Sequence, residues 1–452
     1  SFDIFAVPDT VPASTGGTFS GTIAAAGYSS STAGTSNYIA GVNAGNSITA
    51  GGNYNVTVGD EAGTAITTGD SNTAVGFEAL ATEDTASRNT AIGFRSLKTN
   101  NGGDNNTAVG ENSGTAVTTG HNNTLIGQDA GEALTDADYN TALGSDALQS
   151  DTLGSKSTAV GAAALSTQNF TSATDSHNTA VGYEAGKAVT TGQYNTLVGS
   201  LTGDAMTTGE NNVAMGQDAL TTNVAGDNVV AIGNEAAQLL NPSGNVDMNG
   251  VYIGYQAGDE VTTGRHNTVI GALTANALTT GSNNLLLGTT AGNADQPGGS
   301  ISTGGGQIVL GNASSTNAHI QIDWTVASDE RDKTDFTALD LGLDFVKELE
   351  PVTYKWDKRA KYGNDISTIT HDGTHKEDWL DVGFKAQAVE VLEKAAGYKI
   401  ADKTNLTTSL TDDGKQYGLQ YSKFVPILVK ALQELSEKND ALEARLAALE
   451  AK

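Results

Sequence analysis

The chain has 452 residues, with 55 glycines, 6 prolines, 6% aromatic residues and a formal net charge of −28. Such a chain lacks large side chains for one compact core, which favours a repetitive fold that buries many small side chains. The acidity argues against a nucleic-acid partner, because phosphates would be repelled. Cysteine is absent, which excludes disulfides and thiolate metal sites. Without a long apolar run, we also expect no membrane insertion.

A repeat of 17 residues dominates the first part of the chain. A pentapeptide close to Asn-Thr-Ala-Val-Gly recurs, and its last glycine returns every 17 residues from Gly59 to Gly161. Steps of 21 residues lead to Gly182 and Gly254, and a looser step of 23 residues leads to Gly311. A fixed period of this size is the signature of stacked coils.

Each repeat predicts a short strand and a tight turn. The residues between the asparagine and the glycine are small, apolar and mostly β-forming, and turn residues bound them. Fixed glycines such as Gly120 suit a positive φ or a close approach between coils. The equivalent asparagines are predicted to form hydrogen-bonded ladders along the stack rather than ligand sites. They include Asn72, Asn106, Asn195 and Asn212.

Coils this short favour association. A 17-residue coil with alanine and valine as its inward residues buries little area, and at about 25 cal/mol per Å² this leaves a thin margin against chain entropy. If the coils of three chains pack around one axis, each coil buries more area, so we expect a homotrimer. The four extra residues of the longer steps fall around 167–176 and 241–247. They predict exposed loops, where a shaft can carry binding specificity.

Residues 36–311 resemble the stacked Asn-Thr/Ser-x-x-Gly coils of phage tail-fibre shafts and of trimeric autotransporter adhesin heads. The resemblance implies a trimeric β-helix or β-roll used for adhesion, with a host cell-surface glycan or protein as its receptor. Residues 1–35 would then connect to other virion tail proteins.

The composition changes near residue 312, where glycine becomes sparse and charged and large apolar residues appear. Residues 312–327 form a linker whose alternating part, 319–324, predicts a last strand that closes the stack. Apolar spacing then predicts a helix over 338–349, a half-buried strand over 352–356, and a strand-to-helix passage over 383–393. This pattern indicates a small α+β unit.

The end of the chain has the clearest helical pattern. Leucines recur at alternating steps of four and three, which is a heptad seam, and one asparagine occupies an inner position where it can set the number of strands. We expect a coiled coil of three chains, and the alternative is that the helix packs back on its own domain. The seam residues are Leu428, Leu432, Leu435, Asn439, Leu442, Leu446 and Leu449.

A short charged segment, 327–333, precedes this unit. Taken alone, it reads as a solvated turn. In its position, however, the chain resembles the intramolecular chaperone domain of phage endosialidase-type tail spikes. The matching motifs lie at 328–333, 341–343, 351–356, 383–387 and 421–435, in the right order, and span nearly all of 328–452. One departure is Ala388, where the family commonly has an acidic residue.

The resemblance implies that the domain cuts its own chain between Ala327 and Ser328. Ser328 would be the nucleophile and Lys333 its base, because a serine hydroxyl reacts only when a neighbour takes its proton. Asp329 would orient the turn or polarise the bond, and Arg331 would help to lower the pKa of the lysine. Self-cleavage is the only enzymatic activity expected, and we expect no metal or other cofactor.

The sequence therefore predicts a mainly β protein with a trimeric β-helical shaft at 36–311 and a chaperone domain at 328–452 that ends in a coiled-coil helix. The predicted function is a phage tail fibre that attaches to the host, made in the host cytoplasm and located in the virion. One alternative is a polysaccharide-degrading tail spike, which would need paired acids such as Glu78, Asp129 and Glu184. The other is a cell-surface trimeric adhesin. His371 and His375 are expected to lie in a solvated loop.

Overall fold

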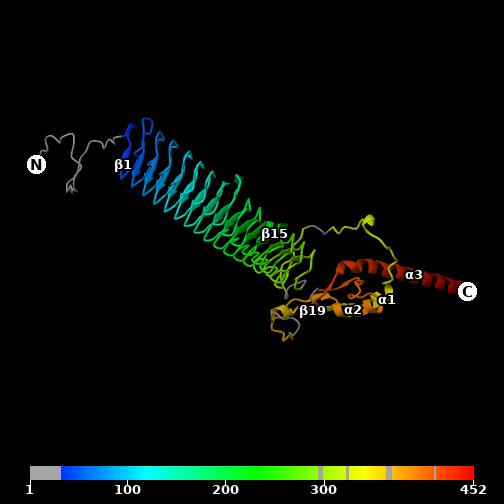
Figure 1. Ribbon diagram of the computed structural model, residues 1–452. Coiled ribbons are helices and arrows are strands. Elements are labelled where there is room, and N and C mark those ends of the chain that lie inside the picture. Colours follow the sequence, from blue (N-terminus) through cyan, green and yellow to red (C-terminus); the bar gives the residue numbers. More distant parts are fainter. Residues whose placement is uncertain (1–31, 294–298, 322–324, 363–368, 412–413, 452) are drawn as a thin grey trace, which may run out of the picture.

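The computed structural model describes residues 32–293, 299–321, 325–362, 369–411 and 414–451. Most of the predicted N-terminal connection, 1–35, lies outside the described residues. Figure 1 shows a long stack of coils, with a smaller unit at its far end that finishes in a long helix. The prediction of a mainly β protein with a solenoid shaft is confirmed.

The shaft is built on one parallel sheet that runs along the whole stack, with one strand from each coil. Within the described residues this sheet has 16 strands, and they are hydrogen-bonded in chain order. They are β1 (Tyr38–Ala40), β2 (Val56–Val58), β3 (Thr73–Val75), β4 (Thr90–Ile92), β5 (Thr107–Val109), β6 (Thr124–Ile126), β7 (Thr141–Leu143), β9 (Thr158–Val160), β11 (Thr179–Val181), β12 (Thr196–Val198), β13 (Val213–Met215), β14 (Gly226–Ile232), β15 (Val246–Ile253), β16 (Thr268–Ile270), β17 (Leu285–Leu287) and β18 (Ile308–Leu310).

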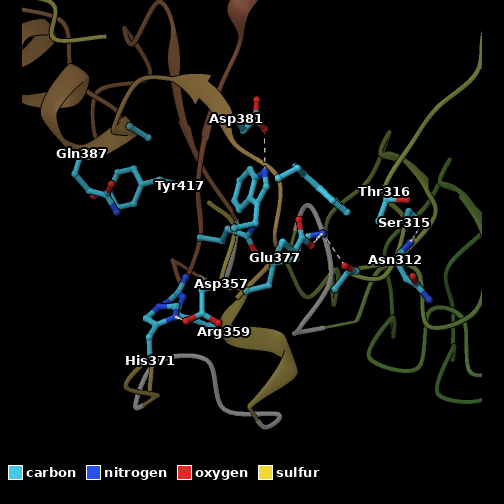
Figure 2. Close-up of a pocket in the computed structure, with 16 residues that line it drawn as sticks. Asn312, Ser315, Thr316, Asp357, Arg359, His371, Glu377, Asp381, Gln387 and Tyr417 are labelled. Carbon is cyan, nitrogen blue, oxygen red and sulfur yellow. Dashed lines mark hydrogen bonds and ion pairs between the residues drawn. The ribbon is translucent and has the colours of Figure 1, made fainter. Parts of the chain in front are cut away.

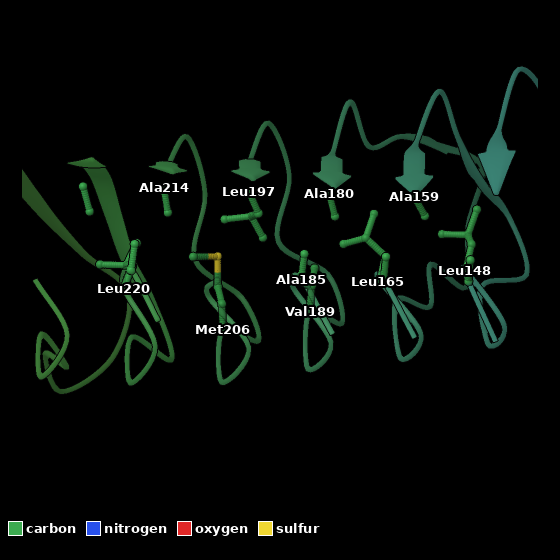
Figure 3. Packing of buried hydrophobic residues seen from close by; sticks show 14 of the residues in the cluster. Leu148, Ala159, Leu165, Ala180, Ala185, Val189, Leu197, Met206, Ala214 and Leu220 are labelled. Carbon is green, nitrogen blue, oxygen red and sulfur yellow. The ribbon is translucent and has the colours of Figure 1, made fainter. Parts of the chain in front are cut away.

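The middle residue of each short strand points into the coil. Because side chains alternate across a strand, the residues on either side of it point outward. Of the alanine and valine of the pentapeptide, both expected to point inward, only the alanine does so, as in Thr107–Val109. Ala74 is fully buried and pairs in register with Ala91 of the next coil. Figure 3 shows Ala180 and Leu197 pointing from their strands toward Val189 and other apolar side chains on the opposite wall. The core is therefore a thin apolar column inside the solenoid.

A ladder of buried asparagines links the coils. The N–H of Asn106 donates to Asn89 Oδ1 (2.8 Å), and its Nδ2 donates to the carbonyl of Gly120 (2.7 Å). The predicted ladders are thus confirmed. At Ser157 the asparagine is missing, and Gln168 Nε2 donates to the serine hydroxyl instead (2.8 Å). The side chains satisfy backbone groups that the turns would otherwise bury without partners.

Two buried positions of the coils vary together in the size and polarity of their side chains. Where the first is leucine, as at Leu97, the second is polar, as at Asn100; where the first is Gly114, the second is Val117. A Cβ at Gly114 would lie 3.4 Å from the side chain of Val117 and 2.7 Å from the side chain of Leu125 in β6. The leucine pairs are Leu80/Glu83, Leu97/Asn100, Leu148/Asp151, Leu165/Gln168 and Leu220/Asn223, and the glycine pairs are Gly45/Ile48, Gly63/Ile66, Gly114/Val117, Gly131/Leu134, Gly186/Val189, Gly203/Met206 and Gly258/Val261. Alanine takes the first position in the pairs Ala237/Leu240 and Ala275/Leu278.

Both longer coils keep the sheet in register. In the first, β10 (Thr174–Asp175) pairs in parallel with β8 (Gly154–Ser155), so part of the insertion becomes a strand. In the second, the start of β15 pairs with the start of β14, and a register shift between Asp227 and Val229 precedes the three residues that continue the sheet. Residues 171–173 and 243–245 are exposed, which confirms that the insertions reach the surface.

The predicted closing strand at 319–324 is wrong for its described part, because 319–321 form no strand and 322–324 lie outside the described residues. The sheet ends at β18. Gly311 then takes a φ of 83°, and the N–H of Ser315 donates to the carbonyl of Asn312 (2.9 Å). This turn directs the chain away from the sheet before another strand can pair.

In its described residues, the C-terminal unit combines three helices with two small antiparallel sheets. The sheets pair β19 (Val352–Tyr354) with β20 (Asp381–Gly383), and β21 (Thr408–Leu410) with β22 (Tyr417–Leu419). The helices are α1 (Leu343–Glu348), α2 (Ala386–Ala395) and α3 (Phe424–Glu450), with 3-10 turns η1 (Glu330–Asp332), η2 (Arg359–Lys361) and η3 (Tyr421–Lys423). The predicted strand-to-helix passage over 383–393 is confirmed. None of the helices in the described part has the length and hydropathy that crossing a membrane requires.

The predicted helix over 338–349 is too long, because α1 begins only at Leu343. Gly342 precedes it with φ −135° and ψ −137°, which no helix can contain, and the N–H of Leu343 donates to Glu434 Oε2 (2.7 Å). Leu341 is buried before the helix starts, in the same core as Phe345. The apolar spacing before Leu343 therefore reflects packing in the core, and the backbone of these residues is not helical.

Candidate functional site

A tight turn brings Ser328 and Lys333 together. The carboxylate of Asp329 caps η1 by accepting from the N–H of Arg331 (2.9 Å), and the N–H of Lys333 donates back to the carbonyl of Glu330 (3.1 Å). The lysine side chain then folds over the turn. Its Nζ lies 2.6 Å from Ser328 Oγ and 3.1 Å from the carbonyl oxygen of Ser328. This serine–lysine pair has the contact that proton transfer from the hydroxyl to the amine requires.

Arg331 forms an ion pair within the same turn. Its Nη2 lies 2.6 Å from Asp329 Oδ2. The hydrogen bonds from Arg331 lower the pKa of Asp329, and the same contact raises the pKa of Arg331. The pair rigidifies the turn and largely offsets the positive charge near Lys333. The roles predicted for Asp329 and Arg331 in cleavage stay predictions.

The serine–lysine pair is fully accessible in the single chain. Residues 325–338 are all exposed, including Ala327 on the other side of the predicted scissile bond. Water therefore reaches both the hydroxyl and the amine. Activation of a lysine base by desolvation would require another surface to cover this turn.

The leucines of the predicted seam point away from their own domain. At its start, α3 buries Phe424, Ile427 and Ala431 in the domain, where it packs against α1. The six leucines of the seam are between 50% and 67% exposed. The alternative that the seam packs back on its own domain is thus wrong, while the coiled coil of three chains stays a prediction. Asn439 Nδ2 donates to Glu443 Oε1 within the helix (3.0 Å).

A cavity of about 560 Å³ lies where the C-terminal unit meets the end of the shaft (Figure 2). One side is lined by Asn312, Ala313, Ser315 and Thr316, and the other side includes Trp356 and Trp379. Lys358 Nζ bridges the two sides by donating to the carbonyl of Ala313 (2.9 Å). The serine–lysine pair does not line this cavity, so the cavity is separate from the predicted cleavage site.

The weaker sequence candidates are not assembled into sites. Glu78, Asp129 and Glu184 occupy equivalent positions in coils that are several repeats apart. Glu78 bonds to Lys98 (2.6 Å), which is the largest cause of its lowered pKa, and Glu184 bonds to Lys187 (3.1 Å). They cannot form one carboxylate pair within a chain.

The two histidines named from the sequence pack on an aromatic ring. The ring of Tyr362 contacts His375 at 4.7 Å and His371 at 5.9 Å between centroids. His371 Nδ1 also lies 3.5 Å from Asp357 Oδ2. In the portion of the chain that the structure describes, no group of three or more His, Asp or Glu side chains gathers as a metal site would.

Sequence reasoning missed Glu393, which anchors the C-terminal unit. Its carboxylate is buried and accepts from both the N–H (2.5 Å) and the hydroxyl (2.7 Å) of Thr407, and also from Thr408. Burial raises its pKa, but the hydrogen bonds from Thr408 and Thr407 outweigh this and lower it. The adjacent threonines were the only signal in the sequence, and nothing there paired them with a glutamate of α2.

Comparison with known families decides the nature of this unit. Residues 328–398 match the model of the family described as chaperone of endosialidase. The chain carries that chaperone domain. The match begins at Ser328 itself and ends after α2, so that α3 lies beyond it. No curated protein matched the chain. A β-solenoid followed by this chaperone domain fits a protein of the tail fibre or tail spike type.

Proposed function

We propose that the protein is a homotrimeric phage tail fibre whose shaft attaches the virion to a host-surface glycan or protein. The observation that carries the proposal is the order of its parts: a solenoid whose described residues form a parallel sheet of 16 strands, then a chaperone domain whose family match starts at Ser328. A long stack of coils can extend from the virion, and its exposed insertions can contact a receptor on the host. Other tail proteins would hold the fibre through residues 1–35.

The chaperone domain solves a folding problem. Parallel coils from three chains have many non-local contacts, so nucleation of the trimer is slow and exposes aggregation-prone strands. The exposed leucines of α3 offer each chain a seam to its copies, which raises the effective concentration of the three shafts. Once the shafts have folded, the domain is no longer needed.

The serine–lysine pair would then release the domain. The neutral amine of Lys333 takes the hydroxyl proton while Ser328 Oγ attacks the carbonyl carbon of Ala327. The bond from that carbon to the nitrogen of Ser328 breaks, the nitrogen takes the proton, and an ester remains on Oγ. Water hydrolyses the ester, which leaves a carboxylate on Ala327 and a free amine and hydroxyl on Ser328.

Assembly would control this step. The turn is exposed in one chain, where water solvates the lysine. Neighbouring copies that cover the turn would exclude this water and favour the neutral amine. A fibre released in this way is trapped kinetically, because the element that nucleated it has gone.

The test is the intact mass of the freshly expressed chain beside its Ser328→Ala variant. The proposal expects the wild type to split between Ala327 and Ser328 and the variant to stay whole. Cleavage at this bond in both proteins would refute the assignment of the nucleophile. If both proteins stay whole and trimeric, the domain is a retained trimeriser and the autoproteolytic part of the proposal is wrong.

A further inference from the structure

One wall of the shaft is an uncharged and largely aliphatic surface. We call it the strand face, and it consists of the first and last residues of the three-residue core of each shaft strand. Both point outward, because the middle residue is buried. The last positions form an unbroken aliphatic file along the shaft. They are Ala40, Val58, Val75, Ile92, Val109, Ile126, Leu143, Val160, Val181, Val198, Met215, Ile232, Ile253, Ile270, Leu287 and Leu310.

The strand face is free of charge in a very acidic chain. The first positions are mostly threonine or β-branched residues, and no charged residue occupies either outward position in any of the 16 strands that the structure describes. The chain as a whole has a net charge of −28. Charged side chains lie just beside the face, as Asp60, Arg88, Glu111 and Lys156 do. An apolar centre with a charged rim is the pattern of a protein interface.

The strand face is large enough for stable association. Strands about 4.8 Å apart make a 16-stranded face roughly 70 Å long, and two outward rows make it about 10 Å wide. This is on the order of 700 Å², close to the ~800 Å² that each partner buries in a standard interface. Figure 1 shows the strands stacked without interruption along the shaft, so the face is continuous.

We propose that the strand face is the surface along which copies of this chain associate, parallel and in the same register. This inference rests on the homotrimer of the proposed function and assigns the shaft's contact surface. A second copy is the favoured occupant because copies charged at −28 can approach closely only through an uncharged wall. The partner must also match a repeat that runs for the entire shaft, and an identical shaft does so.

The seam of α3 supports the parallel orientation. Its exposed leucines lie at the same end in every chain, so copies joined there start side by side with their shafts pointing the same way. Equivalent coils then meet, and each aliphatic residue of the file faces its counterpart. Isoleucine and valine pack well in such files, while the threonine row supplies small side chains that allow close approach.

The chain has no cysteine, which allows a direct test. Val109→Cys and Val198→Cys place single thiols on the strand face, whereas Glu111→Cys places one two residues away on its rim. The full chain and its released shaft are treated with a short bis-maleimide and run on denaturing gels. The proposal expects covalent dimers from the two strand-face variants, and at least tenfold less product from Glu111→Cys. Equal or greater cross-linking from Glu111→Cys would overturn it.

Light scattering separates this inference from the proposed function. If the wild type is multimeric but the strand-face thiols stay unlinked, the inference fails and the homotrimer stands. If the wild type is monomeric, both fail.

A second pair of variants tests whether the strand face binds a host receptor instead of a second copy of the chain. Val109→Lys should dissociate the released shaft, while Glu111→Lys should leave it multimeric, with circular dichroism showing both folded. If Val109→Lys instead leaves the multimer intact and abolishes binding to host cells, the strand face is a receptor surface and the inference is wrong.

Discussion

The side-chain amide of Asn100 donates to the carboxylate of Glu83 in the neighbouring coil, inside the apolar column of the shaft. Both residues are fully buried. The N–H of Ala86 also donates to Glu83 Oε1 (2.6 Å). Burial, with a smaller contribution from the charge of Asp104, raises the pKa of Glu83 from 4.5 to about 7 against the effect of these bonds. Glu83 is therefore a shaft acid that stays protonated when ordinary carboxyl groups have ionised.

Glu83 makes the stability of the shaft fall as the pH rises. Between about pH 4.5 and pH 7 the folded state binds this proton and the unfolded state does not, so unfolding becomes easier with increasing pH. At 1.36 kcal/mol per pKa unit the loss is on the order of 3 kcal/mol per chain. Thermal melts of the wild type and of Glu83→Gln at pH 5 and pH 8 should show the larger drop in the wild type. Equal drops would contradict the assignment.

The compensating core positions predict non-additive substitutions. Gly114→Leu should destabilise the shaft by ~1–3 kcal/mol, because the leucine would crowd Val117 and the strand above it. Val117→Asn should also destabilise it, because a buried amide would lack partners. The double variant copies the pair of Leu97 with Asn100 and relieves the contact with Val117, while the contact with Leu125 remains. It should be more stable than the sum of the two single changes by ~0.5–3 kcal/mol, measured by denaturant unfolding. Simple additivity would show that the two positions are independent.

Lys333 should be required for cleavage. Lys333→Met removes the amine that lies 2.6 Å from the Ser328 hydroxyl, and loss of a general base typically costs ~10²–10⁴-fold in rate. The rate is followed on denaturing gels after the chain has assembled. Lys347→Met is the control, since Lys347 is an exposed lysine of the same domain, paired with Asp344. Unchanged cleavage in Lys333→Met would remove Lys333 from the mechanism.

The seam of α3 should control both assembly and cleavage. In Leu442→Glu/Leu446→Glu the new carboxylates would repel one another between chains, yet both positions are exposed in the folded domain. We expect this variant to remain monomeric and uncleaved. Ala441→Glu/Ala444→Glu adds the same charge off the seam and should assemble and cleave normally. Light scattering and mass spectrometry report the two results, and cleavage by a monomer would show that assembly is not needed.

The sequence identified some residues of the C-terminal unit, and only the structure showed others. The serine and lysine were named from the sequence because they lie within one short turn, whose geometry is local. Glu393 was not, because its threonine partners are 14 and 15 residues away and meet it only through packing.

The sequence by itself determined the period of the shaft, the position of its strands and the asparagine ladder. The period and the strands depend on residues within one coil, and the repeat copies this local solution along the chain. The ladder joins neighbouring coils, and it follows because the repeat places an equivalent asparagine in successive coils. Only the tertiary structure decided where the stack ends, where α1 begins, and which strand residues face outward as an uncharged wall. It also decided that Glu83 meets Asn100 in the core. These features depend on which coil or domain lies next to a residue, and a pattern along the chain does not contain that information until the coils are stacked.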